Sequence, residues 1–575
     1  NLSGFTWRRM TNNLKKKWRL KPQADPVRVK KMVSLIGEKY SSLAEVLVQR
    51  NLNTIEDIKN WIPGVSIQSI DPMQMADMSI AAKRLQLARK NKETIFVFGD
   101  YDVDGTTAVS TVSMALTKGG WNVVTYIPDR YKEGYGLSKK GIDSALETGA
   151  SLLITLDCGI KANDLVDYAK EKNLDVIITD HHTPGEFLPD AIAVINPKRN
   201  DCPFPFKELS GCGVGFMLCR AAYQIELIEL TELDSLMDLV AISIGADMVP
   251  LTGVNRFIVR EGLQMMNNNP RPSISALLGK KKEGLVSLQD VVFAIGPKIN
   301  AAGRMHHGHS AVDLLTTYSP ELLERLGKEI ENYNLERRST EEIISSAAKE
   351  LALTYKNDIA LVLYSSNWHK GVLGIVAQRM VELFHKPTIV LTENDGIISG
   401  SARSVPGLNI YEAIESSSKY ILQFGGHHAA AGLTLTANNL DSFRKEFNIS
   451  VNKHWQQEKR APEILIDTSA KPEDLSKDLC LLLDKLAPFG MGNESPVWGL
   501  FEVTMEKTSY MSSNKHLRTL LTNPESQKQI PAIGFGWGSF RPKNKLVNAA
   551  VILEWNYFRG ERQLQARIID IQNTL

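Results

Sequence analysis

The stretch Gly99-Asp100-Tyr101-Asp102-Val103-Asp104-Gly105 follows directly after the hydrophobic run Thr94–Phe98 (TIFVF). Two later runs end in a similar way: Leu152–Leu156 (LLITL) stops at Asp157, and Asp175–Thr179 (DVIIT) stops at Asp180-His181-His182. Short runs rich in Val, Ile, Thr and Phe, separated by helical stretches, predict buried parallel strands. Ligands of an open α/β sheet collect beyond the carboxyl ends of its strands. We therefore expect these acids and imidazoles to lie along one edge of a sheet.

Carboxylates crowded at one edge repel one another unless cations or protons neutralise them. Asp102 and Asp104 would share one face if their segment is extended, and Asp157 and His181 leave neighbouring strands. Asp247 follows the apolar run Leu239–Ile244 and adds a further acid. An oxygen-rich set with one or two imidazoles suits Mn²⁺ or Mg²⁺, and two such ions would form a clamp for phosphoryl chemistry.

Each motif taken alone has an ordinary structural interpretation. A lone Asp-x-Asp is usually a turn or a helix cap, and a His-His pair is more often a surface or core feature. Three such motifs at three successive strand ends are much harder to explain by turn chemistry. Zinc is disfavoured because the five cysteines are not spaced as zinc ligands.

Composition places the chain among ordinary globular proteins of several domains. It has 575 residues, 43% hydrophobic and 23% charged content, and a net charge of +2. No apolar stretch is long enough to span a bilayer, the N-terminal segment is polar and basic, and the odd number of cysteines suggests free thiols. We expect a cytoplasmic protein without membrane association. The net charge excludes an all-over polycation but permits a basic groove.

Changes of pattern along the chain predict five parts. We expect a helical and loop region at 1–78, an α/β domain with a C-terminal extension at 79–318, and a connecting helix at 319–355 that begins at Ser319-Pro320. A second α/β domain is expected at 356–455, and short strands separated by polar turns predict a β-barrel at 456–575. Within the first α/β domain, helices are expected at Ala108–Leu116 and Asp164–Lys172.

Four motifs together resemble those of the DHH phosphoesterase superfamily. They are Asp102-Val103-Asp104-Gly105, Asp157-Cys158-Gly159, Asp180-His181-His182 and Ala246-Asp247-Met248-Val249-Pro250. The phrases Asn300-Ala301-Ala302-Gly303-Arg304, Gly400-Ser401-Ala402-Arg403-Ser404 and Pro488-Phe489-Gly490-Met491-Gly492-Asn493-Glu494 resemble the bacterial RecJ family within it. The resemblance runs from about residue 51 to the end. It implies a DHH domain, a DHH-associated substrate-binding domain and an OB-like nucleic-acid-binding barrel.

The resemblance also implies roles for individual residues at the metal centre. The implied metal ligands are Asp102, Asp104, Asp157, His181 and Asp247, with Asp157 as the bridge. Asp100 would be a further ligand or a supporting acid, and His182 would contact the scissile phosphate or assist proton transfer. Cys158 departs from the family, which often has Asn there; a thiol would alter the surrounding hydrogen bonds and leave the ligand set intact.

For the substrate, the resemblance implies a pocket for the 5′ end between the two α/β domains. Its candidates are Arg130, Arg304, Ser401 and Arg403, since guanidinium groups bind phosphate in a bidentate fashion. Tyr135 could stack on a base, and His427, in a glycine-rich loop, could donate to phosphate. The plain alternatives are a surface salt bridge for each arginine and ordinary packing for the tyrosine. His306, His307 and His309 are interpreted as a variable loop.

The implied activity is metal-dependent 5′→3′ hydrolysis of single-stranded DNA to 5′-mononucleotides in repair and recombination. Rival interpretations are a DHH oligonucleotide or cyclic-dinucleotide phosphodiesterase, a pyrophosphatase, and a non-catalytic single-strand-binding replication subunit. The first two are usually built without a C-terminal barrel, and the third has lost its metal carboxylates, which this chain keeps. The resemblance further implies a monomer that cooperates with a single-strand-binding protein and a RecQ-type helicase.

Overall fold

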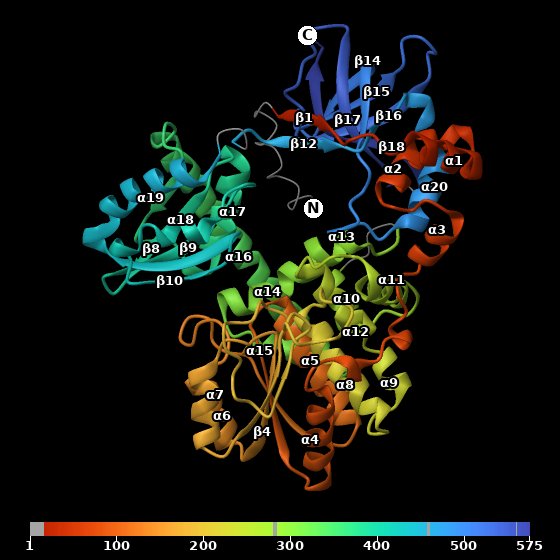
Figure 1. Cartoon of the computed structure of the whole chain (residues 1–575). Helices are drawn as coiled ribbons and strands as arrows, with labels where there is room; N and C mark the ends of the chain where they lie inside the picture. The colour runs from red at the N-terminus through yellow and green to blue at the C-terminus, as the bar shows by residue number, and fades with distance from the viewer. Residues whose placement is uncertain (1–15, 280–283, 457–459, 559, 575) are drawn as a thin grey trace. The chain divides into compact units, whose positions relative to one another are not determined.

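The computed structural model describes residues 16–279, 284–456, 460–558 and 560–574 (Figure 1). The chain divides into two compact units. The parallel-sheet unit comprises residues 54–334 and 482–495. The mixed-sheet unit comprises the described residues up to 53, residues 335–481 and those from 496 onward. Of the predicted N-terminal region 1–78, residues 1–15 lie outside the described residues.

The parallel-sheet unit is built on five strands in the order β3-β2-β4-β5-β6, all parallel. They are β2 (Thr94–Gly99), β3 (Asn122–Tyr126), β4 (Ala150–Leu156), β5 (Asp175–Thr179) and β6 (Ala193–Ile195). The three predicted strands are therefore confirmed as β2, β4 and β5. Because β2, β4 and β5 are neighbours, the acidic and histidine motifs that follow them emerge at the same edge.

Helices cover both faces of this sheet, which explains why its strands are almost continuously apolar (Figure 1). Helices α6 (Lys139–Glu147) and α7 (Asn163–Glu171) pack on the face of Phe96 and Phe98. The face of Ile95 and Val97 is covered by α4 (Met78–Lys90), α5 (Val103–Lys118), α8 (Gly211–Gln224) and α10 (Met237–Ala246). The unit also contains α3 (Ile55–Trp61), α9 (Leu230–Asp234), α11 (Gly253–Asn268), α12 (Pro272–Leu278), α13 (Leu288–Asp290), α14 (Gly296–Met305) and α15 (His309–Thr316).

Helix α5 corrects one expectation from the sequence. The helix begins at Val103 rather than Ala108, so Asp102 is its N-cap and Asp104 lies in its first turn. The prediction that Asp102 and Asp104 share one face of an extended segment is therefore wrong. The physical reason is that the Asp102 carboxylate accepts a hydrogen bond from the Gly105 N–H at 3.1 Å, which caps and starts the helix at this point.

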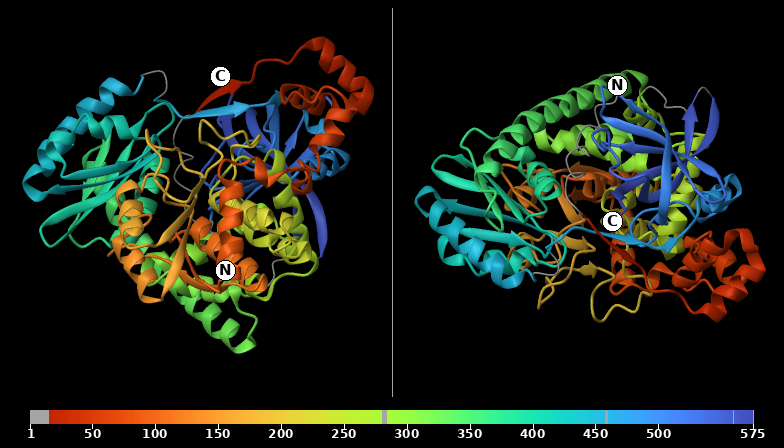
Figure 2. Two further views of the ribbon diagram at one scale, coloured as in Figure 1. Left: turned by 60° about the horizontal axis from the view of Figure 1, so that its bottom comes forward. Right: turned by 90° about the horizontal axis from the view of Figure 1, so that it is seen from above.

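A single long helix, α16 (Pro320–Thr354), follows; it is the long green helix in the right-hand view of Figure 2. Residues such as Leu326 and Ile330 belong to the core of the parallel-sheet unit, whereas Ile344 and Ala348 belong to a core of the mixed-sheet unit. The second α/β fold then forms a sheet in the order β10-β11-β9-β8-β7. Its elements are β7 (Leu361–Tyr364), α17 (Leu373–Phe384), β8 (Thr388–Asn394), β9 (Ile397–Arg403), α18 (Ile410–Glu415), β10 (Gln423–Gly426), β11 (Ala430–Thr436) and α19 (Leu440–His454).

The C-terminal strands close into a ring, as expected for a barrel. The order is β13-β14-β15-β16-β18-β17, and β14 also pairs with β17. The strands are β13 (Thr468–Ser469), β14 (Trp498–Met511), β15 (His516–Thr522), β16 (Gln529–Phe535), β17 (Leu546–Phe558) and β18 (Glu561–Asn573), with α20 (Lys477–Leu486) between β13 and β14.

The N-terminal region contains a strand that the sequence did not predict. Helices α1 (Pro26–Ile36) and α2 (Ser41–Gln49) agree with the expected helical character. However, β1 (Lys17–Leu20) pairs in parallel with β12 (Glu463–Ile466), a partner more than 440 residues away. A four-residue strand with one partner far along the chain leaves no local pattern by which to recognise it.

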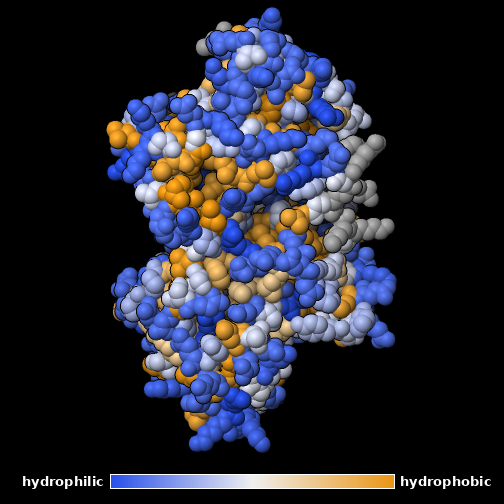
Figure 3. All heavy atoms as spheres, turned by 90° about the vertical axis from the view of Figure 1, so that its right-hand side faces the viewer, coloured by the Kyte–Doolittle hydropathy of each residue, from blue (hydrophilic) through white to orange (hydrophobic). Residues whose placement is uncertain are grey.

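No helix among the described residues is long and apolar enough to cross a membrane. The face drawn in Figure 3 is largely hydrophilic, with hydrophobic side chains gathered in patches among polar ones.

Candidate metal centre

The edge at the carboxyl ends of β2, β4 and β5 gathers the predicted acids and imidazoles. Asp157 follows β4 and adopts a left-handed backbone conformation with φ of 61°. Its N–H donates to the Thr179 carbonyl at 3.0 Å, which fixes the turn against β5. A Cβ on Gly211 would lie 2.6 Å from Oδ1 of Asp157, so only glycine lets helix α8 approach this carboxylate so closely. Strained backbone held this tightly is characteristic of functional sites.

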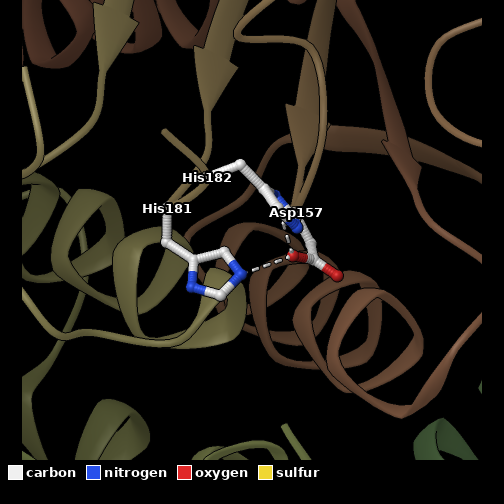
Figure 4. A group of neighbouring side chains, drawn as sticks. All are labelled: Asp157, His181 and His182. Carbon is white, nitrogen blue, oxygen red and sulfur yellow. Dashed lines mark ion pairs between the residues drawn. The ribbon is translucent and has the colours of Figure 1, made fainter. Parts of the chain in front are cut away.

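His181 directs its ring nitrogen Nε2 at Asp157 (Figure 4). Its Nδ1 lies 3.1 Å from the Leu209 carbonyl, which can only accept, so Nδ1 carries the proton and Nε2 carries a lone pair. Burial lowers the pKa of His181, so the ring is neutral near pH 7. Nε2 nevertheless lies 3.1 Å from Oδ1 of Asp157, and neither buried atom has a hydrogen-bond partner. Two facing acceptors of this kind need either a proton or a cation between them.

The carboxylates around this pair are crowded enough to resist ionisation. Three groups each have ligand atoms within 4.8 Å of one another: Asp157, His181 and His182; Asp104, His181 and Asp247; and Asp100, Asp102 and Asp157. Burial, and then the charge of Asp104, raises the pKa of Asp157 well above its usual range and that of Asp247 to about 8. Burial is also the main cause that raises the pKa of Asp100 and Asp102. The second cause is the charge of a neighbouring aspartate, which is Asp102 for Asp100 and Asp104 for Asp102. Cations would remove this repulsion.

Asp104 is held by the N-terminus of helix α8. Its two oxygens accept hydrogen bonds from the Gly211 N–H at 2.7 Å and the Cys212 N–H at 2.8 Å, and Ser243 Oγ donates at 2.6 Å. Backbone N–H groups at a helix start favour a negative charge. These hydrogen bonds hold the Asp104 side chain in place, with Oδ2 3.7 Å from Nε2 of His181. Asp247, at the C-terminal end of α10, lies at the same distance from that nitrogen.

Asp180 organises the two histidines, a role that the sequence reasoning missed. Its Oδ1 accepts from the backbone N–H of His181 at 2.7 Å and from that of His182 at 3.1 Å, and lies 2.7 Å from Nδ1 of His182. Its Oδ2 accepts from the Ile160 N–H at 3.0 Å. Burial alone would raise the pKa of Asp180, but these hydrogen bonds lower it. For His182, burial alone would lower the pKa, but the hydrogen bond with Asp180 outweighs it, and the pKa is raised.

An aromatic and cationic cluster lies beside the metal centre. The Tyr135 hydroxyl is 3.2 Å from Nε2 of His182, and the Tyr135 side chain is 57% exposed, so a face of its ring remains available. Tyr101 packs edge-on against Tyr135, and the Arg130 guanidinium lies 4.6 Å above the Tyr101 ring. The Arg304 carbonyl accepts a hydrogen bond from the Tyr131 hydroxyl. The structure thus brings Tyr135, Arg130 and Arg304 into one region of the parallel-sheet unit.

Three predicted substrate residues lie in the mixed-sheet unit. Ser401 and Arg403 are on β9, and both approach the start of helix α17. A Cβ on Gly374 would lie 2.8 Å from an Arg403 guanidinium nitrogen and 3.5 Å from Ser401 Oγ. His427 is in the turn between β10 and β11, where its N–H donates to the Ala430 carbonyl at 2.9 Å. Ser401 and Arg403 therefore form one group, and His427 belongs to the adjacent hairpin.

The other histidines and the cysteine discussed in the sequence analysis lie in ordinary structural surroundings. His306 stacks on Tyr333 with ring centroids 4.1 Å apart, and His309 lies 3.3 Å from an Asp313 oxygen, so these histidines do not form a common metal tract. Cys158 is buried, and burial raises the pKa of its thiol well above the usual range. Among the aromatic side chains of the barrel, Trp498 is fully buried, whereas Phe501 and Tyr557 are 40% and 39% exposed.

The arrangement of strand ends, carboxylates and histidines matches a known domain class. Residues 94–244 match the DHH family, N-terminal domain; residues 341–453 match the DHHA1 domain; and residues 466–570 match the RecJ OB domain. The chain is thus a three-part protein of the DHH phosphoesterase class.

Comparison with whole chains identifies the family more closely. The chain is 31% identical to the single-stranded-DNA-specific exonuclease RecJ of Escherichia coli over 92% of this chain and 95% of that protein. It is 36% identical to the Bacillus subtilis protein of the same name over 89% of this chain, and spans 66% of that relative's length. A crystal structure of RecJ with Mn²⁺ from Thermus thermophilus superposes with a TM-score of 0.83 at 26% identity, covering 97% of this chain and 80% of that one. The chain belongs to the RecJ family.

Proposed function

We propose that this chain is a metal-dependent exonuclease that hydrolyses single-stranded DNA from the 5′ end to 5′-mononucleotides. The observation that carries the proposal is the buried pair formed by Nε2 of His181 and Oδ1 of Asp157. These two buried atoms lie 3.1 Å apart within a ring of carboxylates, and only a proton or a cation can bridge them. The names of the RecJ relatives supply the substrate, and the family resemblance supplies the polarity.

We propose Mn²⁺ or Mg²⁺ as the cofactor, with two ions held by Asp102, Asp104, Asp157, His181 and Asp247. Carboxylates with one imidazole are the donor set that these ions prefer, and the RecJ crystal structure from Thermus thermophilus contains Mn²⁺. Asp157, which belongs to two of the three ligand groups, is the proposed bridge, and Asp100 supports it within one of those two groups. When bound, the ions supply Lewis-acid activation of water and neutralise the charge on the phosphate.

The residues of the chain itself position the reaction. Asp180 holds His182 with its Nδ1 toward the carboxylate, which leaves Nε2 beside the Tyr135 hydroxyl. The raised pKa of His182 makes it suited to donate a hydrogen bond or a proton to a phosphate oxygen. The exposed Tyr135 ring can stack on the terminal base without reading its identity.

We further propose that Arg130, Arg304, Ser401 and Arg403 hold the 5′ end, with His427 as an additional phosphate donor. The pairing of Ser401 with Arg403 at the N-terminal end of a 12-residue helix supports a phosphate site. The barrel is proposed to bind the following single strand. A cytoplasmic location, a monomeric state and cooperation with a single-strand-binding protein and a RecQ-type helicase remain proposals from the family resemblance.

The decisive experiment incubates long single strands, labelled at either end, with Mn²⁺ or Mg²⁺. Wild-type protein should release a labelled mononucleotide first from the 5′-labelled strand. Asp157→Ala should abolish cleavage and keep most of the DNA affinity, because distant basic contacts remain. Asp190→Ala is the matched control, since Asp190 is an exposed acid paired with Lys170. Full activity of Asp157→Ala would overturn the proposed metal centre.

The 5′-end pocket has its own test. Arg304→Ala and Arg403→Ala should reduce the preference for a 5′-phosphorylated strand, whereas Arg325→Ala, on the exposed surface of α16, should leave that preference unchanged. Equal losses on phosphorylated and unphosphorylated strands would contradict the pocket. A non-catalytic single-strand-binding subunit is not favoured, because such proteins have lost metal carboxylates and this chain keeps three groups of acids and histidines that could hold a metal ion.

A further inference from the structure

Residues 486–493, here called the strap, belong to the parallel-sheet unit although they lead into the first long strand of the barrel. The strap is closed on itself. Gly490 and Asn493 exchange backbone hydrogen bonds at 2.9 and 3.1 Å. The Asn493 side chain donates to the carbonyls of Leu486 at 3.0 Å and Pro488 at 2.8 Å. Asn493 is only 2% exposed, so this small loop has a fixed shape.

A fully buried arginine ties the strap to helix α11. Arg256 has no exposed surface and donates from one side of its guanidinium to the carbonyls of Leu486 and Ala487, each at 3.0 Å. From Nε it donates to the carbonyls of Trp61 and Ile62 at 3.1 and 3.0 Å. The guanidinium also lies 3.9 Å from the centre of the Trp61 ring. A buried cation solvated by fixed carbonyls locks three distant segments together.

The strap presses directly on the loop that carries Asp247. The Leu251 N–H donates to the Met491 carbonyl at 2.7 Å. Gly492 has a φ of +71°, and a Cβ there would lie 3.2 Å from Pro250 Cβ, so the two backbones are closely apposed. Asn255 also holds this loop, donating to the Pro250 carbonyl at 3.0 Å and to the Glu208 carbonyl at 2.6 Å.

Asp247 depends on this support because its carboxylate makes few contacts that would hold it in place. In the part of the chain that the structure describes, its only ion-pair partner is His181 at 3.7 Å, and it accepts no protein hydrogen bond there. Asp104, by contrast, is fixed by three donors. We propose that the strap, with Arg256 and Asn493 as positioning residues, holds the 247–252 loop so that the Asp247 carboxylate is placed for cation binding. This inference rests on the proposed metal chemistry.

The test measures Mn²⁺ binding to the full chain by electron paramagnetic resonance, with Asn493→Ala and Gly492→Ala as the variants. Asn493→Ala removes the two side-chain bonds that close the strap, and Gly492→Ala strains a left-handed backbone against Pro250. Each should weaken the binding of one Mn²⁺ by ~10-fold, as expected when a partner behind a metal ligand is lost. Affinity for single-stranded DNA in the presence of a chelator should not change, and on DNA the loss should fall on kcat rather than KM. Arg256→Lys, which keeps the charge and loses the forked donors, should give an intermediate affinity.

Gly119→Ala is the matched control for simple destabilisation. A Cβ at Gly119 would meet the Trp121 ring at 2.3 Å, but Gly119 follows the C-terminal end of α5, away from Asp104 in its first turn. It should lower thermal stability and leave Mn²⁺ affinity unchanged. Wild-type Mn²⁺ affinity in both strap variants would overturn the inference, and so would a loss of Mn²⁺ affinity in Gly119→Ala equal to theirs. If Asp247→Asn loses one Mn²⁺ while the strap variants do not, the metal centre stands and only the strap's role falls.

Discussion

Binding of Mn²⁺ to the metal-free protein should release protons, with Asp247 as the best-defined source. Burial, and then the charge of Asp104, raises the pKa of Asp247 to about 8. A carboxyl with that pKa is about nine-tenths protonated at pH 7 and about one-tenth protonated at pH 9. Because a ligand carboxylate must be deprotonated, cation binding should expel about 0.9 proton from Asp247 at pH 7 and about 0.1 at pH 9. Asp100 and Asp157, whose pKa is also raised, can only add to this release.

The assay is calorimetric titration of Mn²⁺ in two buffers that differ in their enthalpy of ionisation. The difference between the two heats gives the number of protons released, and it should shrink as the pH rises from 7 to 9. Asp247→Asn should remove Asp247's share, whereas Asp190→Asn, a change at an exposed acid, should not. Identical heats in both buffers at pH 7 would refute the reasoning that crowding keeps these carboxyls protonated without metal.

The raised pKa of Asp247 also determines whether the free energy of unfolding rises or falls with pH. Between the ordinary carboxyl pKa of 3.8 and the folded value of about 8, the folded metal-free protein binds more protons at Asp247 than the unfolded chain. Stability therefore falls as the pH rises through this window, by up to about 1.4 kcal/mol per pH unit for one such group. Urea unfolding at pH 5 and pH 8, with chelator or with Mn²⁺, should show the loss only with chelator.

Three further predictions concern single side chains. Asp180→Asn should reduce Mn²⁺ affinity or kcat by about 10- to 100-fold and lower the pKa of His182 in an NMR titration, because the neutral amide removes the negative charge beside His182 and its nitrogen cannot accept from the Ile160 N–H; an unchanged His182 pKa would contradict this. Tyr135→Ala should weaken binding of a short single strand by about 1–3 kcal/mol while Tyr135→Phe does not, if the ring stacks on a base; equal affinities for all three proteins in fluorescence anisotropy would exclude stacking. Glu341→Gln should lower the free energy of unfolding by about 3–5 kcal/mol, because Glu341 is buried between Arg337 and Arg379, and an unchanged urea midpoint would contradict it.

The sheet and its metal-binding edge could be predicted because their signals are local. A buried strand needs only a short apolar run, and parallel strands place whatever follows them at one edge. This reasoning identified β2, β4 and β5 and the residues after them. It failed at Asp102 and Asp104. We expected their segment to be extended and the helix to begin at Ala108, whereas Asp102 caps a helix that begins five residues earlier, at Val103.

The groups that orient the ligands could not be found in the same way. The Leu209 carbonyl fixes the tautomer of His181, and the Gly211 N–H fixes Asp104, yet backbone groups carry no sequence signal. Ser243 could be recognised only from its contact with Asp104, which lies 139 positions earlier. Strand β1 was not predicted for the same reason, because its partner β12 lies far along the chain. Features that depend on long-range backbone contacts can be identified only from the structure.

The centre is built so that its carboxylates repel one another, a repulsion that protons relieve in the metal-free protein and cations relieve when they bind. Helix α8 fixes the Asp104 carboxylate, the left-handed turn at Asp157 drives a second carboxylate toward it, and Leu209 ensures that His181 presents a lone pair rather than a proton. In a purely structural core the facing atoms of Asp157 and His181 would be unfavourable, because an unpaired buried acceptor costs about 1–3 kcal/mol. All of these constraints are favourable for a divalent cation, because preorganised ligands need no rearrangement when it binds. The backbone contacts that hold these side chains in the metal-free protein therefore contribute to its affinity for cations.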